Sequence, residues 1–148
     1  MGGGATKQAS PEVKRKDPKV VLEERIAQGR EKETFDLLEK CPELMNSGLN
    51  DEDGMRPLQI ACRGGHIDIV KRLLAKGAVL DQKNKTGATA LMYAAAGGFD
   101  EICKLLLDAG ADVRQADKNA KTALQYAQLH SKAKAENLLQ MYACEYTW

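Results

Sequence analysis

The sequence has no apolar run that approaches the roughly 20 residues needed to span a bilayer, and its first residues lack the apolar segment of a secretory signal. Aromatic residues make up only 5% of the chain, which argues against a surface for stacking nucleic-acid bases. The net charge is +1, without the excess of Lys and Arg that general nucleic-acid binding requires. We therefore expect a chain that folds in water and binds no nucleic acid.

The residues that carry most catalysis and metal binding are also scarce. There are two histidines and four cysteines, and no two cysteines have the close CxxC spacing of a zinc or redox site. Gly-rich nucleotide motifs are missing as well. The sequence thus predicts no enzyme, cofactor, metal or small-molecule substrate. The cysteines are expected to be reduced thiols of an intracellular protein.

What the sequence does contain is an internal repeat. Three segments begin at Asp51, Asn84 and Asp117, each 33 residues after the last. Self-similarity at this period is typical of a solenoid of small units, each of which buries its apolar face against a neighbour. The positions that recur in step include Leu58, Leu91 and Leu124; Ala61, Ala94 and Ala127; and Leu73, Leu106 and Leu139.

Each unit is predicted to hold two helices and an extended, hairpin-like loop. Thr89 and Thr122 are placed to cap the first helix, and Pro57 fits its first position. Gly98 is placed to end that helix, and Gly110 is placed to end the second helix. Cys62 and Cys103 fall at apolar positions, so we expect them to be buried and inert.

Two further units diverge from this pattern. The stretch that follows Asp17 and Pro18, a predicted cap and first helical residue, aligns with the repeat at an offset of 36, which implies a longer loop near residues 45–50. The last unit lacks the Gly-Gly break. Both carry many charged residues, as capping units with one wet face should. The repeats also allow a subunit or fragment of a larger assembly, although caps at both ends disfavour a fragment.

The stretches "GMRPLQIACRGGHIDIVKRLLAKGA" and "GATALMYAAAGGFDEICKLLLDAGADV" resemble ankyrin repeats. The resemblance implies an all-α solenoid of stacked helix-turn-helix units joined by β-hairpin-like loops. We expect a flexible, basic tail over residues 1–16 and a repeat domain over 17–148. Its repeats cover about 17–50, 51–83, 84–116 and 117–148.

The resemblance also implies that a partner protein binds at the loop tips and on the concave face of the first helices. His66 falls at a position that is usually structural, and Tyr93 and Tyr126 are expected in the core. The predicted tip residues are Glu52, Asp53, Met55, Lys85, Thr86, Ala88, Lys118, Asn119 and Lys121, and the predicted groove residues are Arg56, Arg63, Gly64, Ala96, Gly97, Leu129 and His130.

The N-terminus suggests a second function. "MGGGAT" fits the N-myristoylation pattern, with Gly2 as acceptor and Thr6 at the Ser/Thr position. A single myristoyl chain binds membranes only marginally, so a basic cluster would have to supply a second signal. That cluster consists of Lys7, Lys14, Arg15, Lys16 and Lys19.

Two functions stay open at this point. The first is a non-catalytic adaptor or scaffold, monomeric and cytoplasmic, held on the cytoplasmic face of a membrane when Gly2 is acylated. The second is a soluble regulator that inhibits an enzyme such as a kinase. The sequence does not exclude a nuclear location, and it does not identify the partner.

Overall fold

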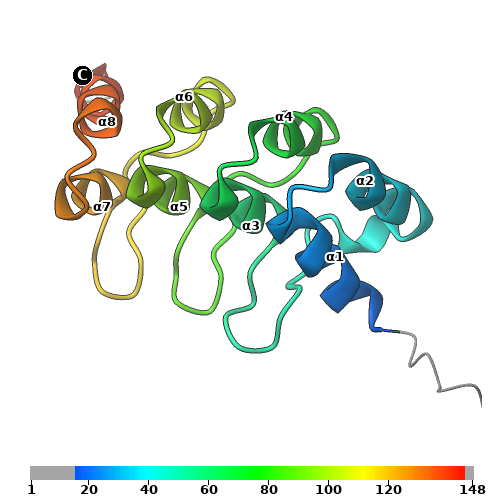
Figure 1. Cartoon of the computed structure of the whole chain (residues 1–148). Helices are drawn as coiled ribbons and strands as arrows, with labels where there is room; N and C mark the ends of the chain where they lie inside the picture. The colour runs from blue at the N-terminus through cyan, green and yellow to red at the C-terminus, as the bar shows by residue number, and fades with distance from the viewer. Residues whose placement is uncertain (1–15, 146–148) are drawn as a thin grey trace, which may run out of the picture.

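Four helix pairs stacked side by side make up the fold (Figure 1). The computed structural model describes residues 16–145. The first helices of the pairs form an inner row and the second helices an outer row, and long loops extend from the inner row (Figure 1). The helices are α1 Pro18–Ala27, α2 Glu31–Lys40, α3 Pro57–Gly64, α4 Ile67–Ala75, α5 Ala90–Gly97, α6 Asp100–Asp108, α7 Ala123–Leu129 and α8 Ala133–Glu145.

The helix starts follow the predicted capping residues. The Asp17 carboxylate accepts a hydrogen bond from the Lys19 N–H (2.9 Å), and Pro18 occupies the first position of α1. Thr122 caps α7, and its hydroxyl accepts from the Gln125 N–H (3.4 Å). The first pair is followed by a short 3₁₀ turn, Pro42–Leu44, where the sequence requires a longer connection.

The core combines small residues on the inner row with leucines on the outer row. Inner helices pack against one another, α1 on α3, α3 on α5 and α5 on α7. Fully buried alanines let these helices approach closely, and fully buried leucines fill the space under the outer helices. The alanines are Ala61, Ala94, Ala95 and Ala127, and the leucines are Leu73, Leu106 and Leu139.

In the second, third and fourth units the loop and the turn after the first helix both have left-handed backbone, and the last unit makes both without glycine. Gly98 ends α5 with a φ of 72°, and Ser131 takes the equivalent place after α7 with a φ of 55°. In the loops, Gly87 has a φ of 79° and Ala120 one of 59°. The missing Gly-Gly break therefore does not prevent the turn in the last unit.

The neighbouring repeat explains why glycine is needed elsewhere. A Cβ added at Gly87 would lie 2.8 Å from the backbone nitrogen of Lys118 in the next loop. No repeat within residues 16–145 follows the fourth, so a side chain at Ala120 meets no such loop. Gly87 is therefore needed for space as well as for its backbone conformation, whereas Ala120 meets only the strain of a positive φ.

None of the helices within residues 16–145 combines the length and the apolar character needed to cross a bilayer.

Candidate functional site

The tips of adjacent loops are joined by backbone hydrogen bonds. The Lys85 N–H donates to the Asp53 carbonyl (2.8 Å), and the Lys118 N–H donates to the Thr86 carbonyl (3.1 Å). The Lys83 ammonium adds a bond to the Ala116 carbonyl of the next loop (3.0 Å). The three tips are thus held at a fixed spacing as one continuous edge of the molecule.

Each loop is shaped by an Asn or Asp at its start. Asn84 Oδ1 accepts from the Thr86 and Ala88 N–H groups (3.1 and 2.9 Å). Short polar side chains commonly bond to the backbone of a following turn in this way. This role was not predicted from the sequence, although the recurrence of Asn50, Asn84 and Asp117 before the three tips is a signal for it. Asp117 accepts from the Asn119 and Lys121 N–H groups, and Asn50 from those of Asp53 and Met55.

A tyrosine on the inner helix fixes two of these loops. Asn84 Nδ2 donates to the Tyr93 hydroxyl (2.8 Å), while the Tyr126 hydroxyl donates to Asp117 Oδ2. Both rings are partly buried against the core, as predicted. The two tyrosines connect the second and third loops to the helices that follow them.

The pKa values of Tyr126 and Asp117 are both shifted from their ordinary values. The hydrogen bond to Asp117, followed by burial, raises the pKa of Tyr126 to about 12. Burial is the largest single influence on Asp117 and opposes ionisation. The bonds from Tyr126 and from two backbone N–H groups together outweigh it, so the pKa of Asp117 lies below its ordinary value.

Most predicted tip residues are accessible. Their charge changes along the edge, from acidic at the first tip to basic at the second and third. Asp53 is half-buried, and the exposed tip residues are Glu52, Lys85, Thr86, Lys118, Asn119 and Lys121.

Three predicted contact residues are not accessible in the way expected. Met55 is fully buried and Ala88 is 6% exposed, because the carbonyls of both pair with their own loop and turn these positions inward. Arg56 is half-buried, and its guanidinium donates to the Asn46 carbonyl (3.1 Å). The prediction of Met55 and Ala88 as binding residues is wrong, and Arg56 braces the preceding loop.

The inner helices supply the other half of the surface. Arg63, Gly64, Gly97 and His130 are exposed, and Ala96 is half-buried. Helix α5 carries no charged side chain. Leu129, at the end of α7, is 63% exposed. We define the inner surface as the exposed tip residues together with Arg63, Ala96, Gly97, Leu129 and His130.

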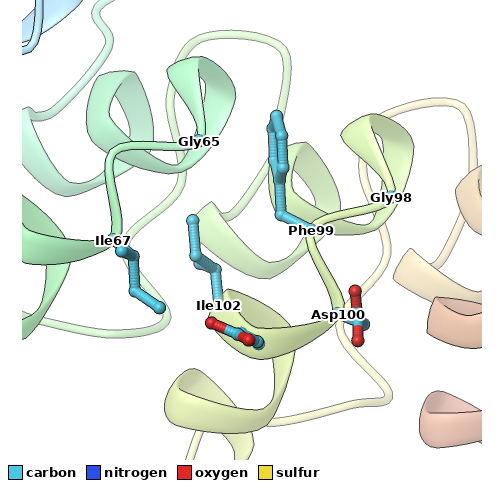
Figure 2. Close-up of a pocket in the computed structure, with 7 residues that line it drawn as sticks. Gly65, Ile67, Gly98, Phe99, Asp100 and Ile102 are labelled. Carbon is cyan, nitrogen blue, oxygen red and sulfur yellow. The ribbon is translucent and has the colours of Figure 1, made fainter.

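Residues at the start of the outer helices set the spacing between repeats. His66 Nε2 lies 3.1 Å from the Ala27 carbonyl, and a Cβ at Gly64 would lie 2.6 Å from the ring. Phe99 takes the equivalent place one repeat later, beside Gly65 (Figure 2). The structural role predicted for His66 fits this geometry.

Figure 2 shows a hollow beside Phe99 that includes Asp100 and Ile102. Its volume is about 210 Å³. It brings carboxylates and apolar side chains together without a histidine, cysteine or basic residue in its lining. Over residues 16–145, no cluster of three His, Cys, Asp or Glu could hold a metal ion.

The buried thiols are poor nucleophiles. Cys62 and Cys103 are both fully buried, as predicted. Burial, and to a lesser extent the nearby Cys103, raises the pKa of Cys62. Burial and the Asp100 charge raise the pKa of Cys103 to about 12. The thiolate forms needed for nucleophilic attack are therefore suppressed.

Gly2, the predicted lipidation site, lies outside the described residues. The same holds for Lys7, Lys14 and Arg15 of the basic cluster. The other two members are described. Lys16 pairs with Glu24 at the surface (3.1 Å), and Lys19 is exposed.

Comparison with known protein families gave one match. A family model described as "Ankyrin repeats (3 copies)" matches residues 26–117 and 80–147. A comparison with curated proteins found no match.

Proposed function

Because the chain belongs to the ankyrin-repeat family, we propose that it is a non-catalytic adaptor that holds one partner protein on its inner surface. Repeats of this family indicate a protein–protein interaction module. The partner, the residues that bind it and the monomeric state of the chain are parts of the proposal.

The observation that carries the proposal is the continuity of the inner surface. The loop tips are bonded to one another through Lys85 and Lys118, so they form a fixed edge. On the inner helices that follow these loops, Arg63 and Leu129 are exposed. A pre-formed surface with accessible charged and apolar groups binds at a smaller ordering cost than mobile loops would.

The proposal is tested by affinity capture from the cells that make the protein. The double variant Arg63→Glu, Leu129→Asp places two carboxylates on the inner surface. A matched control, Lys71→Glu, Met141→Asp, makes the same kinds of change at exposed positions of α4 and α8. The inner-surface variant is expected to lose the captured partner, and the control to keep it. Equal capture by both variants would contradict the proposal.

A second part of the proposal is membrane attachment through Gly2. Its support is the "MGGGAT" sequence, with Thr6 at the Ser/Thr position, followed by a basic cluster. One acyl chain and a few basic residues give reversible binding to an anionic membrane. The intact mass of the protein from its own cells should show loss of Met1 and gain of a myristoyl group. A Gly2→Ala variant should lose both the added mass and the membrane fraction.

The alternative is a soluble inhibitor of an enzyme such as a kinase. The small number of repeats fits such a regulator, because the chain is short enough to act as a single binding unit. The captured partner distinguishes the two functions. If it is an enzyme whose activity falls on adding the purified chain, the protein is an inhibitor; if its activity is unchanged, the adaptor stands.

A further inference from the structure

We infer that the inner surface takes an extended, charge-split segment of its partner. Basic residues of this segment face the first loop tip, acidic residues face the third, and an apolar side chain lies between them. The inference rests on the proposed function and adds the chemistry of the bound segment.

The charges at the two ends of the edge have opposite sign. Glu52 and Asp53 lie on the first tip, and Lys118 and Lys121 on the third. In the part of the chain that the structure describes, none of these four side chains takes part in an ion pair. Lys121 lies 6.0 Å from the centre of the Tyr126 ring and its charge also acts on Asp117, and all but the half-buried Asp53 are exposed to a partner.

Two of the other basic groups near the tips are already engaged. The Lys85 ammonium donates to the Asp51 carbonyl, and the Lys83 ammonium donates to the Ala116 carbonyl. Asp117 is held by Tyr126. These bonds fix the two lysines in place but leave them charged, so the edge is acidic at the first tip and basic from the second tip to the third.

The centre of the inner surface is apolar and shallow. Helix α5 has no charged side chain, and Ala96 and Gly97 present little bulk to the surface. The exposed Leu129 lies one repeat further along. An apolar side chain of the partner placed here would remove Leu129 from water.

The loop ladder sets the length of the segment. Each loop has two extended arms, and neighbouring extended segments lie about 4.8 Å apart. One repeat therefore advances along the edge by roughly 10 Å. The distance from the first tip to the third is then about 20 Å. An extended peptide advances about 3.3 Å per residue, so about six residues separate its basic and acidic groups.

Charge at both ends provides selectivity rather than large affinity. A single exposed ion pair contributes little. A segment with one sign of charge, however, would be attracted at one tip and repelled at the other. The surface therefore selects a charge-split segment over a uniformly basic or acidic one.

The test uses labelled synthetic peptides and the full chain, with binding followed by fluorescence polarisation. The split peptide has three lysines, a six-residue Gly/Ser spacer with one central leucine, and three glutamates, and is made in both chain directions. A scrambled peptide of the same composition alternates the charges. We expect one direction of the split peptide to bind at least tenfold more tightly than the scrambled one, and this preference to fall with added salt.

Charge-reversal variants then identify the ends. Lys118→Glu, Lys121→Glu makes both ends acidic, so it should weaken the split peptide about tenfold and strengthen an all-lysine version. Glu52→Lys, Asp53→Lys makes both ends basic, so it should also weaken the split peptide and should strengthen an all-glutamate version. The control Lys71→Glu, Lys104→Glu makes the same charge change on the exposed surface of the outer row and should alter neither. Unchanged thermal midpoints show that each variant is folded.

The outcomes separate the inference from the proposed function. Equal binding of split and scrambled peptides, or no gain for the all-lysine peptide on the Lys118→Glu, Lys121→Glu variant, overturns the inference. If Arg63→Glu, Leu129→Asp still abolishes capture of the partner in that case, the proposed function stands without it. If the captured partner is retained by that variant, the proposed function itself fails.

Discussion

The hydroxyl of Tyr126 donates a hydrogen bond to the carboxylate of Asp117, and this bond runs in the opposite sense to its counterpart one repeat earlier. There, the amide of Asn84 donates to the hydroxyl of Tyr93. The loop and helix are joined at the same place in both repeats, but only in the last repeat does the joint depend on an ionised group.

Replacement of Tyr126 by Phe should make this dependence visible. At neutral pH we expect a loss of about 1 kcal/mol in the free energy of unfolding, because the carboxylate loses its side-chain donor. Asp117 has a lowered pKa in the folded state, so its contribution is present above its ordinary value near 3.8 and fades as the pH falls. Urea unfolding at pH 3 and pH 7 measures the difference, which should shrink in acid.

At alkaline pH the stability that comes from Tyr126 should fall as the pH rises. Tyr126 has a pKa of about 12 in the folded chain against an ordinary 10, so the folded state holds its proton longer. Stability from this group is complete below pH 10 and is lost as the pH rises toward 12. Tyr93→Phe serves as the control, because its partner Asn84 carries no charge. If the loss of stability in Tyr93→Phe shrinks between pH 7 and pH 3 as much as the loss in Tyr126→Phe, the assignment of the bond is wrong.

The left-handed residues of the last repeat offer a stabilising change. Ala120→Gly and Ser131→Gly should each raise the free energy of unfolding by about 1 kcal/mol, because a residue with a Cβ is strained at positive φ. Denaturant titration of each variant and of the pair measures the gain.

A suitable control is Ala109→Gly, since Ala109 is exposed and has a φ of −77°. Glycine there relieves no strain and should be neutral or destabilising by less than about 1 kcal/mol. A gain at Ala109 equal to that at Ala120 would show that the effect does not arise from the left-handed conformation.

Gln59 is a buried polar residue whose bonds join two repeats. Its Nε2 group donates to the carbonyls of Gln82 (2.6 Å) and Ala88 (3.0 Å), and its Oε1 accepts from the Arg56 N–H (3.0 Å). Gln59→Met should cost about 2 kcal/mol, because the Gln82 carbonyl and the Arg56 N–H lose a buried partner and the Ala88 carbonyl loses one of two.

The same substitution at the equivalent position of the last repeat is the comparison. Gln125 is exposed and bonds only within its own helix start, to Thr122. Gln125→Met should cost less than about 1 kcal/mol. Equal losses at Gln59 and Gln125 would refute the bridging role of Gln59.

Thiol reactivity should divide the four cysteines in two pairs. Cys41 is half-buried and Cys144 exposed, whereas Cys62 and Cys103 are fully buried with raised pKa values. In the folded chain at neutral pH, a thiol reagent should label Cys41 and Cys144 and reach the other two only in denaturant. Mass mapping of labelled peptides gives the answer, and rapid native labelling of Cys62 would contradict it.

Much of this fold could be predicted from residue spacing. A period of 33 residues places Leu73, Leu106 and Leu139 in one row, and packing of equivalent faces follows from it. The helix starts at Pro18 and Ala123 could be predicted because caps act locally, through the chemistry of Asp17 and Thr122.

The accessible residues of the loops were harder to predict. Met55 and Ala88 lie next to exposed positions in sequence, but their carbonyls pair within the loop and turn the side chains inward. Family resemblance marks the loop as a whole and does not separate its two faces. The hydrogen bonds that Asn50 and Asn84 accept from the N–H groups of these two residues depend on three-dimensional geometry.

The hydrogen bond from the Lys118 N–H to the Thr86 carbonyl also makes the Lys118 amide a probe for detachment of the last repeat. Its N–H is protected from solvent only while the third loop stays docked on the second. Stability in a repeat array is a sum of units and nearest-neighbour interfaces, so a terminal unit can open alone. Amide hydrogen exchange at Lys118 therefore measures terminal opening, and exchange at Lys85 measures separation one step further in. A ligand that bridges the first and third tips would slow both.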